Sequence, residues 1–433
     1  MGFLLDLGYA AAGVILSPWI IYKASKDPAF RAGIGERLGG IPRREGERPC
    51  LWIHCASVGE VALARPLVQE LRVRRPDLEF HFSTYTPAGR EQARKTWPDD
   101  RVHYFPLDLT LAVRRALRAA RPDAVVLVEL EVWPNFIRTA AKRGIPVAIV
   151  NGRISHRSHR RYRRFGAYFQ SVFRRLARAG MQTKTYADRI RELGLPADRV
   201  HVTGNLKYDA RIEFDLAETM EEVRAAFGLP PEQRLLVAGS THDPEEKILV
   251  ETYRRILQTY PKLRLLIAPR HVDRTPEVRK IVEAAGFAVT LRSELKEPPP
   301  ADRVFILDTV GELAQVYAAA DAVFIGGTFS TRGGQNMLEP AALGKPIVSG
   351  PSLENFREIA DRLIEAGAMK VVDNPIDLGM AIGSLIKEPA LAAKAGHKGM
   401  DVVESGRGAL KATADLVCGL LPDRKEAPPA STV

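Results

Sequence analysis

Two segments of this chain place reactive side chains directly after predicted strands, and the first is Ser57-Val58-Gly59-Glu60. It follows the apolar run 51–54, which predicts a strand. Ser-x-x-Glu before an apolar run is a capping box, in which both side chains satisfy free N–H groups of a new helix. Ligands of α/β folds also bind at strand ends, so Glu60 can equally be a general base. Gly59 favours a ligand, because glycine is a poor helix former that lets other groups approach the backbone.

The second segment is the glycine-rich stretch FIGGTFSTRGGQNMLEPAALGKPIVSGP, residues 324–351. It predicts a strand, a loop, and then a helix opened by Asn336 with Glu339 in its first turn. Backbone N–H groups at such a helix start suit a phosphate, which glycines allow to come close. The spacing is that of neither a P-loop nor a dinucleotide fingerprint, which disfavours an ATPase or an NAD enzyme. The alternative is that Asn336 only caps the helix, with Glu339 completing the cap.

Further candidates are single side chains near other strand ends. Arg270 can bind a phosphate with two hydrogen bonds, and the alternative is a surface arginine. Lys207 lies near the expected crossing between domains, where its ammonium group can meet a ligand or only solvent. Glu131 follows a strand too apolar to be exposed, which favours a ligand-facing carboxylate over a cap or ion pair. Ser240, Thr241 and His242 follow the first strand of the second half of the chain, where phosphate or sugar can bind.

The elements that position these residues alternate between short apolar runs and amphipathic stretches such as 61–74 and 111–121. Such alternation predicts parallel sheets covered by helices. The pattern restarts after residue 232, and 433 residues are too many for one ordinary core. We therefore expect an α/β fold of two Rossmann-like doubly wound domains that face a cleft. The predicted strands are 51–55, 79–83, 124–129, 146–150, 200–202, 235–239, 263–268, 288–291, 304–307, 322–326 and 346–349.

The amino-terminal residues 3–22 are almost wholly apolar apart from Asp6, and about 20 such residues can cross a bilayer as a helix. Lysines and arginines follow, so the positive-inside rule places the rest of the chain in the cytoplasm. We expect a membrane anchor, with a buried or interfacial helix as the alternative because Pro18 and Asp6 weaken a span. The expected division is an anchor over 1–24, domains over 25–208 and 233–402, a linker over 209–232, a carboxyl-terminal helix over 403–422 that can cross back, and a disordered tail over 423–433.

The formal net charge of +11 indicates an acidic partner. Arginines crowd residues 153–178 between aromatic side chains, a pattern that suits an anionic membrane surface or a phosphorylated acceptor. A merely solvated face is the alternative, and nucleic acid is disfavoured because no nucleic-acid module accompanies the run. Cys50, Cys55 and Cys418 lack metal-ligand or redox spacing, so we interpret them as packing residues. The expected acceptor or membrane residues are Arg153, Arg157, Arg160 and Arg161.

These segments together resemble the 3-deoxy-D-manno-octulosonic acid (Kdo) transferases of lipopolysaccharide synthesis. The resemblance starts with RAGIGERLG (31–39) and the Ser57 to Glu60 segment, and it ends with the glycine-rich stretch. The segments between them occur in the family's order: LEVWPN (130–135), NGRISHRS (151–158), TGNLKYD (203–209), GSTHDPEE (239–246), APRHVDR (268–274) and DTVGELAQVYAAADAVFIGG (308–327).

The resemblance implies an inverting GT-B glycosyltransferase that needs no metal or other cofactor. The implied donor is CMP-Kdo, and the implied acceptor is the acylated, bis-phosphorylated glucosamine disaccharide of the lipid A precursor. It makes Glu60 the general base, with Glu131 and Lys207 as further catalytic residues. The expected residues for the donor and its CMP group are Ser240, Thr241, Pro269, Arg270, His271, Val310, Gly311, Glu312, Gly334, Gln335, Asn336, Met337, Leu338 and Glu339.

Three positions depart from the family's pattern. The loop usually reads Gly-Gly-His-Asn-Pro, whereas this chain has Gln335 and Met337 in place of the histidine and the proline. Ser352 follows Pro351 where a histidine is common. Gln335 can still donate and accept hydrogen bonds, but it does not titrate. A related CMP-sugar or another glycolipid acceptor is therefore the alternative substrate, and a glycolipid-binding relative without turnover is the non-enzymatic alternative.

Overall fold

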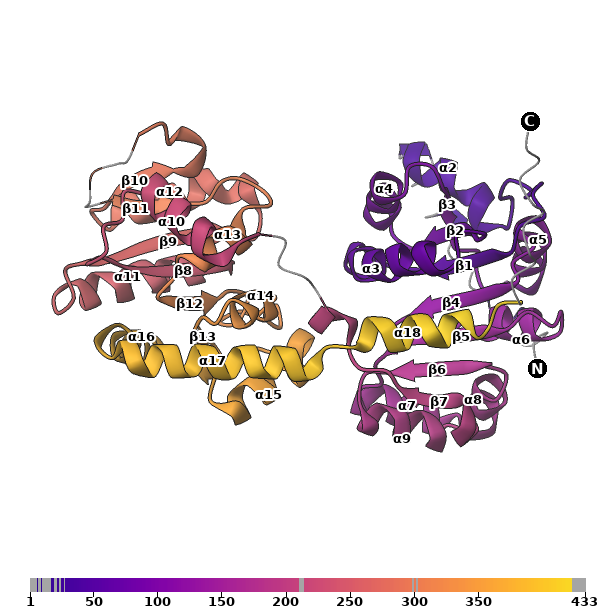
Figure 1. The fold of residues 1–433 in the computed structure, drawn as a ribbon. Helices are drawn as coiled ribbons and strands as arrows, with labels where there is room; N and C mark the ends of the chain where they lie inside the picture. The colour runs from indigo at the N-terminus through magenta and orange to yellow at the C-terminus, as the bar shows by residue number, and fades with distance from the viewer. Residues whose placement is uncertain are drawn as a thin grey trace, which may run out of the picture. The chain divides into compact units, whose positions relative to one another are not determined.

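The structure is a computed structural model that describes residues 28–209, 214–297, 300 and 303–422, together with positions 6, 9, 17, 18, 22, 25 and 26. The chain forms two compact units. Unit 1 consists of Met1–Ala210 and Arg407–Val433, and unit 2 consists of Arg211–Gly406. Within the described residues, each unit contains a seven-stranded sheet in which all neighbouring strands run parallel (Figure 1). The expected pair of parallel-sheet α/β domains is confirmed.

The sheet of unit 1 has the strand order β3-β2-β1-β4-β5-β6-β7. The chain proceeds outward in one direction from β1 to β3 and in the other from β4 to β7, so the topological switch point lies between β1 and β4. Every residue of β1 and β4 is buried, which explains why both were recognisable as continuous apolar runs. The strands are β1 (Cys50–His54), β2 (Glu79–Thr84), β3 (Arg101–Tyr104), β4 (Ala124–Val128), β5 (Val147–Gly152), β6 (Arg178–Met181) and β7 (Val200–Val202).

Helices cover both faces of this sheet, because successive side chains of a strand point to opposite faces. Trp52 of β1 belongs to one core cluster, and its neighbours Leu51 and Ile53 belong to the other. The helical elements of unit 1 ahead of the crossing are α2 (Pro28–Arg37), α3 (Val58–Arg74), α4 (Pro87–Thr96), α5 (Thr110–Ala120), α6 (Pro134–Ala141), α7 (His156–Arg164), α8 (Gly166–Phe173), α9 (Lys184–Glu192), η1 (Ala197–Arg199) and η2 (Leu206–Asp209).

A final helix, α18 (Ala409–Cys418), completes unit 1 from the far end of the chain. It packs against α3 and beside β5 and β6 (Figure 1). The carboxylate of Asp209 accepts hydrogen bonds from the backbone N–H groups of Gly408 (2.8 Å) and Leu410 (2.7 Å). One side chain therefore joins the point where the chain leaves unit 1 to the point where it returns.

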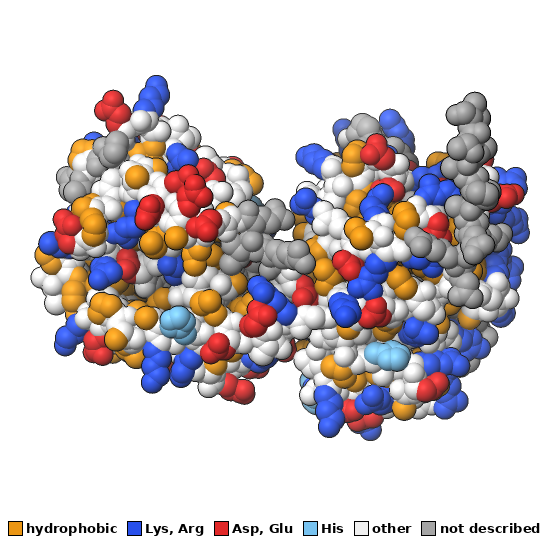
Figure 2. All heavy atoms as spheres, in the orientation of Figure 1, with side chains coloured by type: hydrophobic (Ala, Val, Ile, Leu, Met, Phe, Trp, Pro, Cys, Tyr) orange, Lys and Arg blue, Asp and Glu red, His pale blue; other side chains and the backbone are white. Residues whose placement is uncertain are grey.

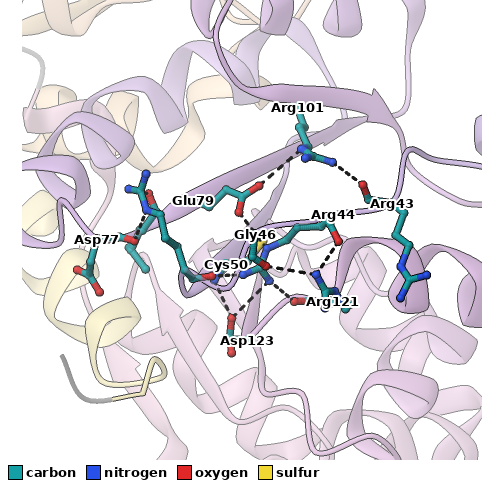
Figure 3. A network of polar contacts seen from close by, with 11 residues as sticks. Arg43, Arg44, Gly46, Cys50, Asp77, Glu79, Arg101, Arg121 and Asp123 are labelled. Carbon is teal, nitrogen blue, oxygen red and sulfur yellow. Dashed lines mark hydrogen bonds and ion pairs between the residues drawn. The ribbon is translucent and has the colours of Figure 1, made fainter. Parts of the chain in front are cut away.

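The amino ends of the central strands are held together by a network around Arg44 (Figure 3). Only 4% of Arg44 is exposed, and its guanidinium donates to Glu79 (3.0 Å) at the start of β2. Asp123, just ahead of β4, accepts the N–H of Cys50 (2.7 Å) at the start of β1 and lies 3.8 Å from Arg44. Arg121 and Arg44 each donate to the other's carbonyl at 2.6 Å. These charged side chains therefore stabilise the amino ends of the strands, whereas Glu60 lies at the opposite, carboxyl edge of the sheet.

Unit 2 repeats the plan with the strand order β10-β11-β9-β8-β12-β13-β14, so its switch point lies between β8 and β12. Its strands are β8 (Arg234–Thr241), β9 (Leu263–Pro269), β10 (Ala288–Leu291), β11 (Arg303–Ile306), β12 (Ala322–Ile325), β13 (Ile347–Ser349) and β14 (Met369–Val371). Its helical elements are α10 (Leu216–Ala226), α11 (Glu245–Leu257), η3 (Val272–Arg274), α12 (Thr275–Ala284), η4 (Arg292–Glu294), α13 (Leu313–Ala318), α14 (Leu338–Ala342), η5 (Glu354–Phe356), α15 (Arg357–Ala366), α16 (Pro375–Lys387) and α17 (Pro389–Gly406).

The stretch 209–232, which was expected to be a linker, is in part a helix. Its residues 216–226 form helix α10, which packs against α13 within unit 2. Phe227, directly after α10, is buried and meets the ring of Phe305 with 5.0 Å between centroids. The polar composition that suggested a linker instead belongs to the exposed face of a helix.

Most of the expected anchor over 1–24 lies outside the described residues, as does the expected tail over 423–433. Within the described ranges, no helix has the length and apolar character needed to cross a membrane. Asp6, which is described, accepts hydrogen bonds from the backbone N–H of Thr110 (2.9 Å) and from the side-chain amide of Asn135 (3.0 Å). This acidic residue of the apolar segment thus caps the start of α5.

We expect Asp209→Ala to destabilise unit 1 by about 1 kcal/mol, a typical cost of losing a helix cap. The loss should appear in urea-induced unfolding and as faster hydrogen exchange in the first turn of α18. Asp198→Ala serves as a control because Asp198 is exposed in the same half of unit 1. Equal unfolding curves for wild type and Asp209→Ala would show that this junction does not hold α18 in place.

Candidate functional site

Glu60 lies in the first turn of α3, at the carboxyl end of β1. The Oγ of Ser57, the N-cap residue, accepts the N–H of Glu60 (3.4 Å), while Glu60 Oε2 accepts the N–H of Ala56 (2.7 Å). The hydroxyl of Ser57 also donates to Glu60 Oε1 (3.1 Å). Glu60 is therefore a capping residue. A carboxylate has about four lone-pair positions, so this role leaves Glu60 able to accept a further proton or hydrogen bond.

The environment of Glu60 makes it a weaker acid and hence a stronger base than an ordinary glutamate. Burial is the main cause that raises its pKa from 4.5 to about 8, and the nearby carboxylates of Glu129 and Glu131 raise it further. The hydrogen bonds from Ala56 and Ser57 act in the opposite direction. A Cβ placed on Gly59 would meet only the Ser57 hydroxyl, at 3.9 Å, so packing within the chain does not require glycine there.

Glu131 comes from the loop after β4, across the switch point from Glu60. The indole N–H of Trp133 donates to Glu131 Oε2 (3.0 Å). The same oxygen lies 4.0 Å from Nε2 of His54, which is fully buried. Burial lowers the pKa of His54 to about 3, so this imidazole is neutral and the approach is not an ion pair. Burial also raises the pKa of Glu131, which the Trp133 hydrogen bond partly opposes.

Lys207 lies on the short helix η2, whose position is fixed by two buried asparagines. Asn151, at the end of β5, accepts the N–H of Leu206 with its side-chain oxygen (3.0 Å). Asn205 accepts the N–H of Lys207 itself (3.1 Å). The motifs NGRISHRS and TGNLKYD are thus in direct contact, although 55 residues separate Asn151 from Leu206.

The expected basic surface of unit 1 lies mainly on α7. Arg157, Arg160 and Arg161 are exposed there, whereas Arg153 precedes the helix and is half-buried. Tyr162 faces inward, and 58% of Phe165, at the end of the helix, is exposed. The residues therefore form one amphipathic basic helix.

The corresponding edge of unit 2 carries the segments that follow β8, β9, β11 and β12. Arg270 is exposed, and within the described residues its guanidinium has no hydrogen-bond or ion-pair partner. Pro269 is buried at the end of β9, and His271 is exposed. Ser240 is half-buried in a left-handed backbone conformation (φ +55°). Thr241 is fully buried, and its hydroxyl donates to Glu246 (2.9 Å), so it cannot reach a ligand directly.

Glu245 determines what the glycine-rich loop can bind. Its carboxylate is fully buried and accepts four backbone N–H groups at 2.7 to 2.9 Å. The donors are His242, Gly327, Thr328 and Phe329. The N–H of Gly333 and of Gly334 are also occupied, by Ser352 (3.1 Å) and by the Gly327 carbonyl (2.9 Å).

These N–H groups of the loop are therefore not available to a phosphate, whereas phosphate binding at the start of the following helix stays a prediction. Helix α14 also begins at Leu338, two residues later than expected, and it has only five residues. The N–H of Leu338 is taken by the side-chain oxygen of Asn336 (3.1 Å). A phosphate at this edge can also meet side-chain donors.

The side chains of residues 335–339 differ in whether their polar groups can bind a ligand. The amide of Asn336 donates to Glu339 (2.9 Å), which is half-buried, and burial raises the pKa of Glu339. Met337 and Leu338 are buried, so only their backbone can contact a ligand. The amide nitrogen of Gln335 lies 3.2 Å from Nε2 of His242.

The expected turn over 310–312 lies at the same edge, after β11. Val310 is 85% exposed and Gly311 has a left-handed backbone (φ +98°). Glu312 is partly occupied, because it accepts hydrogen bonds from Arg292 (2.9 Å) and from the hydroxyl of Thr309. Within the described part of the chain, no group of three His, Cys, Asp or Glu side chains could hold a metal ion.

Residues 32–210 match the family described as 3-deoxy-D-manno-octulosonic-acid transferase (kdotransferase). A 3-deoxy-D-manno-octulosonic acid transferase of Haemophilus influenzae is 33% identical over 399 residues, which cover 90% of this chain and 92% of the relative. The chain belongs to the Kdo transferase family. A second relative of the same name, from Chlamydophila psittaci, is 32% identical over 380 residues and covers 84% of each chain.

Solved structures with low sequence identity share the fold of this Kdo transferase family member. The UDP-GlcNAc 2-epimerase of Neisseria meningitidis has a TM-score of 0.57 at 16% identity, with 86% of this chain and 100% of that chain covered. MurG of Acinetobacter baumannii has a TM-score of 0.55 at 15% identity, with 86% of this chain and 99% of that chain covered. These similarities concern the GT-B-like fold alone.

Several side chains at the two edges were not among the sequence-based candidates. Glu129 is the first residue after β4 and has a left-handed backbone (φ +59°). Its negative charge raises the pKa of Glu60. Arg332 is an exposed arginine within the glycine-rich loop, where its position in the motif could have marked it. Glu245 and Glu246 follow β8 closely, but nothing in the sequence shows that both become buried.

We expect Glu245→Gln to destabilise unit 2 by about 2–4 kcal/mol. Each carboxylate oxygen accepts two N–H groups, so an amide would leave two buried donors facing an NH₂ group. Urea unfolding and hydrogen exchange at residues 327–329 would measure the effect. Glu251→Gln on the exposed side of α11 is the matched control, and equal stability of the two variants would rule out this role of Glu245.

Proposed function

We propose that this chain is an inverting glycosyltransferase that moves Kdo from CMP-Kdo to the glucosamine disaccharide of the lipid A precursor. The observation that carries the proposal is the half-buried carboxylate of Glu60. It sits at the switch point of unit 1 beside Glu129 and Glu131, with its pKa raised to about 8. The 33% identity with a named Kdo transferase over 90% of the chain supports the choice of sugar.

In the proposed reaction, an acceptor hydroxyl oxygen attacks the anomeric carbon of Kdo while the bond from that carbon to the CMP phosphate oxygen breaks. The electron pair of the broken bond leaves on the phosphate, and the hydroxyl proton passes to Glu60. A carboxylate within hydrogen-bond reach suffices as the base, and attack from the face opposite to CMP inverts the configuration. The N–H of Ala56 and the hydroxyl of Ser57 fix the orientation of the Glu60 carboxylate.

Side chains help to stabilise the leaving phosphate in this proposal, because many of the loop N–H groups are occupied. Arg270 and Arg332 are exposed guanidinium groups at the carboxyl edge of the unit 2 sheet, and such groups bind phosphate strongly. Glu339 is assigned to the ribose hydroxyls, since a carboxylate accepts two hydrogen bonds. Glu131 and Lys207 are assigned to the acceptor side, where they orient the hydroxyl and its neighbouring anionic groups.

The proposed acceptor surface is basic and partly apolar, as an anionic lipid requires. Helix α7 contributes its exposed arginines together with Phe165. Helix α5 carries exposed Arg114, Arg115 and Arg118 beside Leu111, which is 62% exposed. Basic side chains crowd the margin of unit 1 where α5 and α6 lie (Figure 2). We assign this surface to the cytoplasmic face of the inner membrane, which the positive residues after 3–22 support.

A transferase for a related CMP-sugar or another glycolipid remains the second candidate. Gln335 and Ser352 favour it, because they occupy positions where the family pattern has histidines. Either change alters the hydrogen bonds that the donor sugar can receive.

Incubation of the purified protein with CMP-Kdo and tetraacyl disaccharide bisphosphate tests the proposal. We expect CMP release together with an increase in lipid mass by one or more Kdo units. A mass increase only with another CMP-sugar would support the second candidate. Lipid binding with no turnover of any CMP-sugar would contradict both.

We expect Glu60→Gln to fold normally and to transfer at least about a hundredfold more slowly, as for a lost general base. Glu70→Gln, on the same helix, is the matched control because Glu70 pairs with Arg74 away from the strand end. Rates and urea unfolding should be measured together. A Glu60→Gln variant that keeps its rate and loses about 1 kcal/mol of stability would make Glu60 a cap alone.

A further inference from the structure

The contact between Gln335 and His242 joins the two loops that flank the switch point of unit 2. The amide nitrogen of Gln335 and Nε2 of His242 are 3.2 Å apart, although 93 residues separate them in the sequence. His242 is 8% exposed, whereas Gln335 is half-buried. Within the described residues, the imidazole has no other hydrogen-bond partner.

The backbones of both loops are tied to Glu245. The N–H of His242 donates to Glu245 Oε2 (2.9 Å), and the N–H of Gly327 donates to the same oxygen (2.7 Å). The N–H of Gly334, next to Gln335, donates to the Gly327 carbonyl (2.9 Å). The buried carboxylate of Glu245 thus fixes the backbone on both sides of the contact. The distance between the side chains of His242 and Gln335 is therefore set by the fold of unit 2.

The chemistry of the two groups fixes where the imidazole proton lies. An amide nitrogen carries only hydrogens, so it can donate to the ring nitrogen but cannot accept from it. Nε2 of His242 must then present its lone pair, which places the proton of a neutral imidazole on Nδ1. A protonated ring would carry N–H on both nitrogens, so that the Nε2–H of His242 would face the N–H of the Gln335 amide and neither could accept.

The surroundings also favour the neutral ring. Burial is the main cause that lowers the pKa of His242, and the charges of Arg332, His271 and Arg274 lower it further. Glu246 acts in the opposite direction, but it is ion-paired with Arg274 at 2.7 Å. The ring of His271 approaches to 5.9 Å between centroids without a hydrogen bond.

We propose that Gln335 holds His242 as the neutral tautomer with its proton on Nδ1, and that this N–H donates a hydrogen bond to an anionic oxygen of the sugar nucleotide. The second part rests on the proposed function, since it assumes that unit 2 binds a CMP-sugar. Gln335 is then a positioning residue that acts through His242. In this proposal, the chain binds its donor through a histidine in its neutral form.

Nitrogen NMR of the full-length protein, labelled in its histidines, tests the tautomer directly. The His242 signal is identified by its loss in His242→Ala. We expect the wild type to show a protonated Nδ1 and an unprotonated Nε2 at pH 7 to 8. Gln335→Leu should show a mixture of both tautomers, and Gln335→Glu should raise the pKa of His242, because a carboxylate accepts from a protonated Nε2. A wild-type ring protonated on Nε2, or on both nitrogens at pH 7, would overturn the proposal.

Calorimetric binding of CMP tests the role of the pair. We expect Gln335→Leu to weaken CMP binding about three- to tenfold, as for one hydrogen bond. The matched control is Gln258→Leu, at an exposed position of unit 2, which should bind as the wild type does.

The same loss should disappear when Gln335→Leu is introduced into His242→Ala, because the two residues act as one unit. Additive losses in the double variant would overturn the proposal. The tautomer and the coupled affinities do not depend on which sugar is transferred. If both are observed while CMP-Kdo gives no transfer, only the proposed function fails.

Discussion

Each parallel sheet has one switch point, where the chain leaves two neighbouring strands in opposite directions. The rest of the structure depends on this constraint. Between β1 and β4, and again between β8 and β12, the loops leave their strands in opposite directions. No crossover helix can then fill the space above the strand ends, which is where α/β proteins bind ligands. Glu60 and Glu131 flank that position in unit 1, and His242 and Gln335 flank it in unit 2.

The glutamates at the two switch points differ in how many hydrogen bonds their carboxylates accept. Glu245 accepts four backbone N–H groups, and this satisfied carboxylate holds a glycine-rich loop in one shape. Glu60 accepts one backbone N–H and one hydroxyl, and two further carboxylates lie close to it. Its charge is therefore costly, which is the property a base needs in order to take a proton. Family membership alone does not reveal this difference between the two carboxylates.

The sequence predicted the central strands well because buried parallel strands are continuous apolar runs, as 124–129 for Ala124–Val128 illustrates. It missed β3, β6 and β14, which have only three or four residues and contain charged side chains. Helix α10 was taken for a linker because a short helix with one buried stripe has a polar composition. For Glu60, the cap is local, as the Ser-x-x-Glu pattern predicts, whereas the raised pKa depends on burial and on Glu129 and Glu131 after β4, so no local pattern could decide between its two roles.

Contacts over long sequence separations account for the remaining errors. The N–H groups of Gly327, Thr328 and Phe329 looked available because Glu245, 82 to 84 residues earlier, gave no sign that it would occupy them. The contact of Gln335 with His242 was equally hidden, although both residues had been singled out. Sequence patterns identify the segments at a strand end, but the geometry decides which of their groups are still free to bind.

The pH dependence of kcat/KM for the wild type and for Glu60→Gln tests the central claim most directly, since this ratio reports the free enzyme. Burial raises the pKa of Glu60 to about 8, so the carboxyl is protonated and inactive as a base at lower pH. We predict that kcat/KM of the wild type rises with pH and levels off above about pH 8. The small residual rate of Glu60→Gln should lack this rise. A wild-type profile without it, or the same inflection in both proteins, would contradict the assignment of Glu60 as the base.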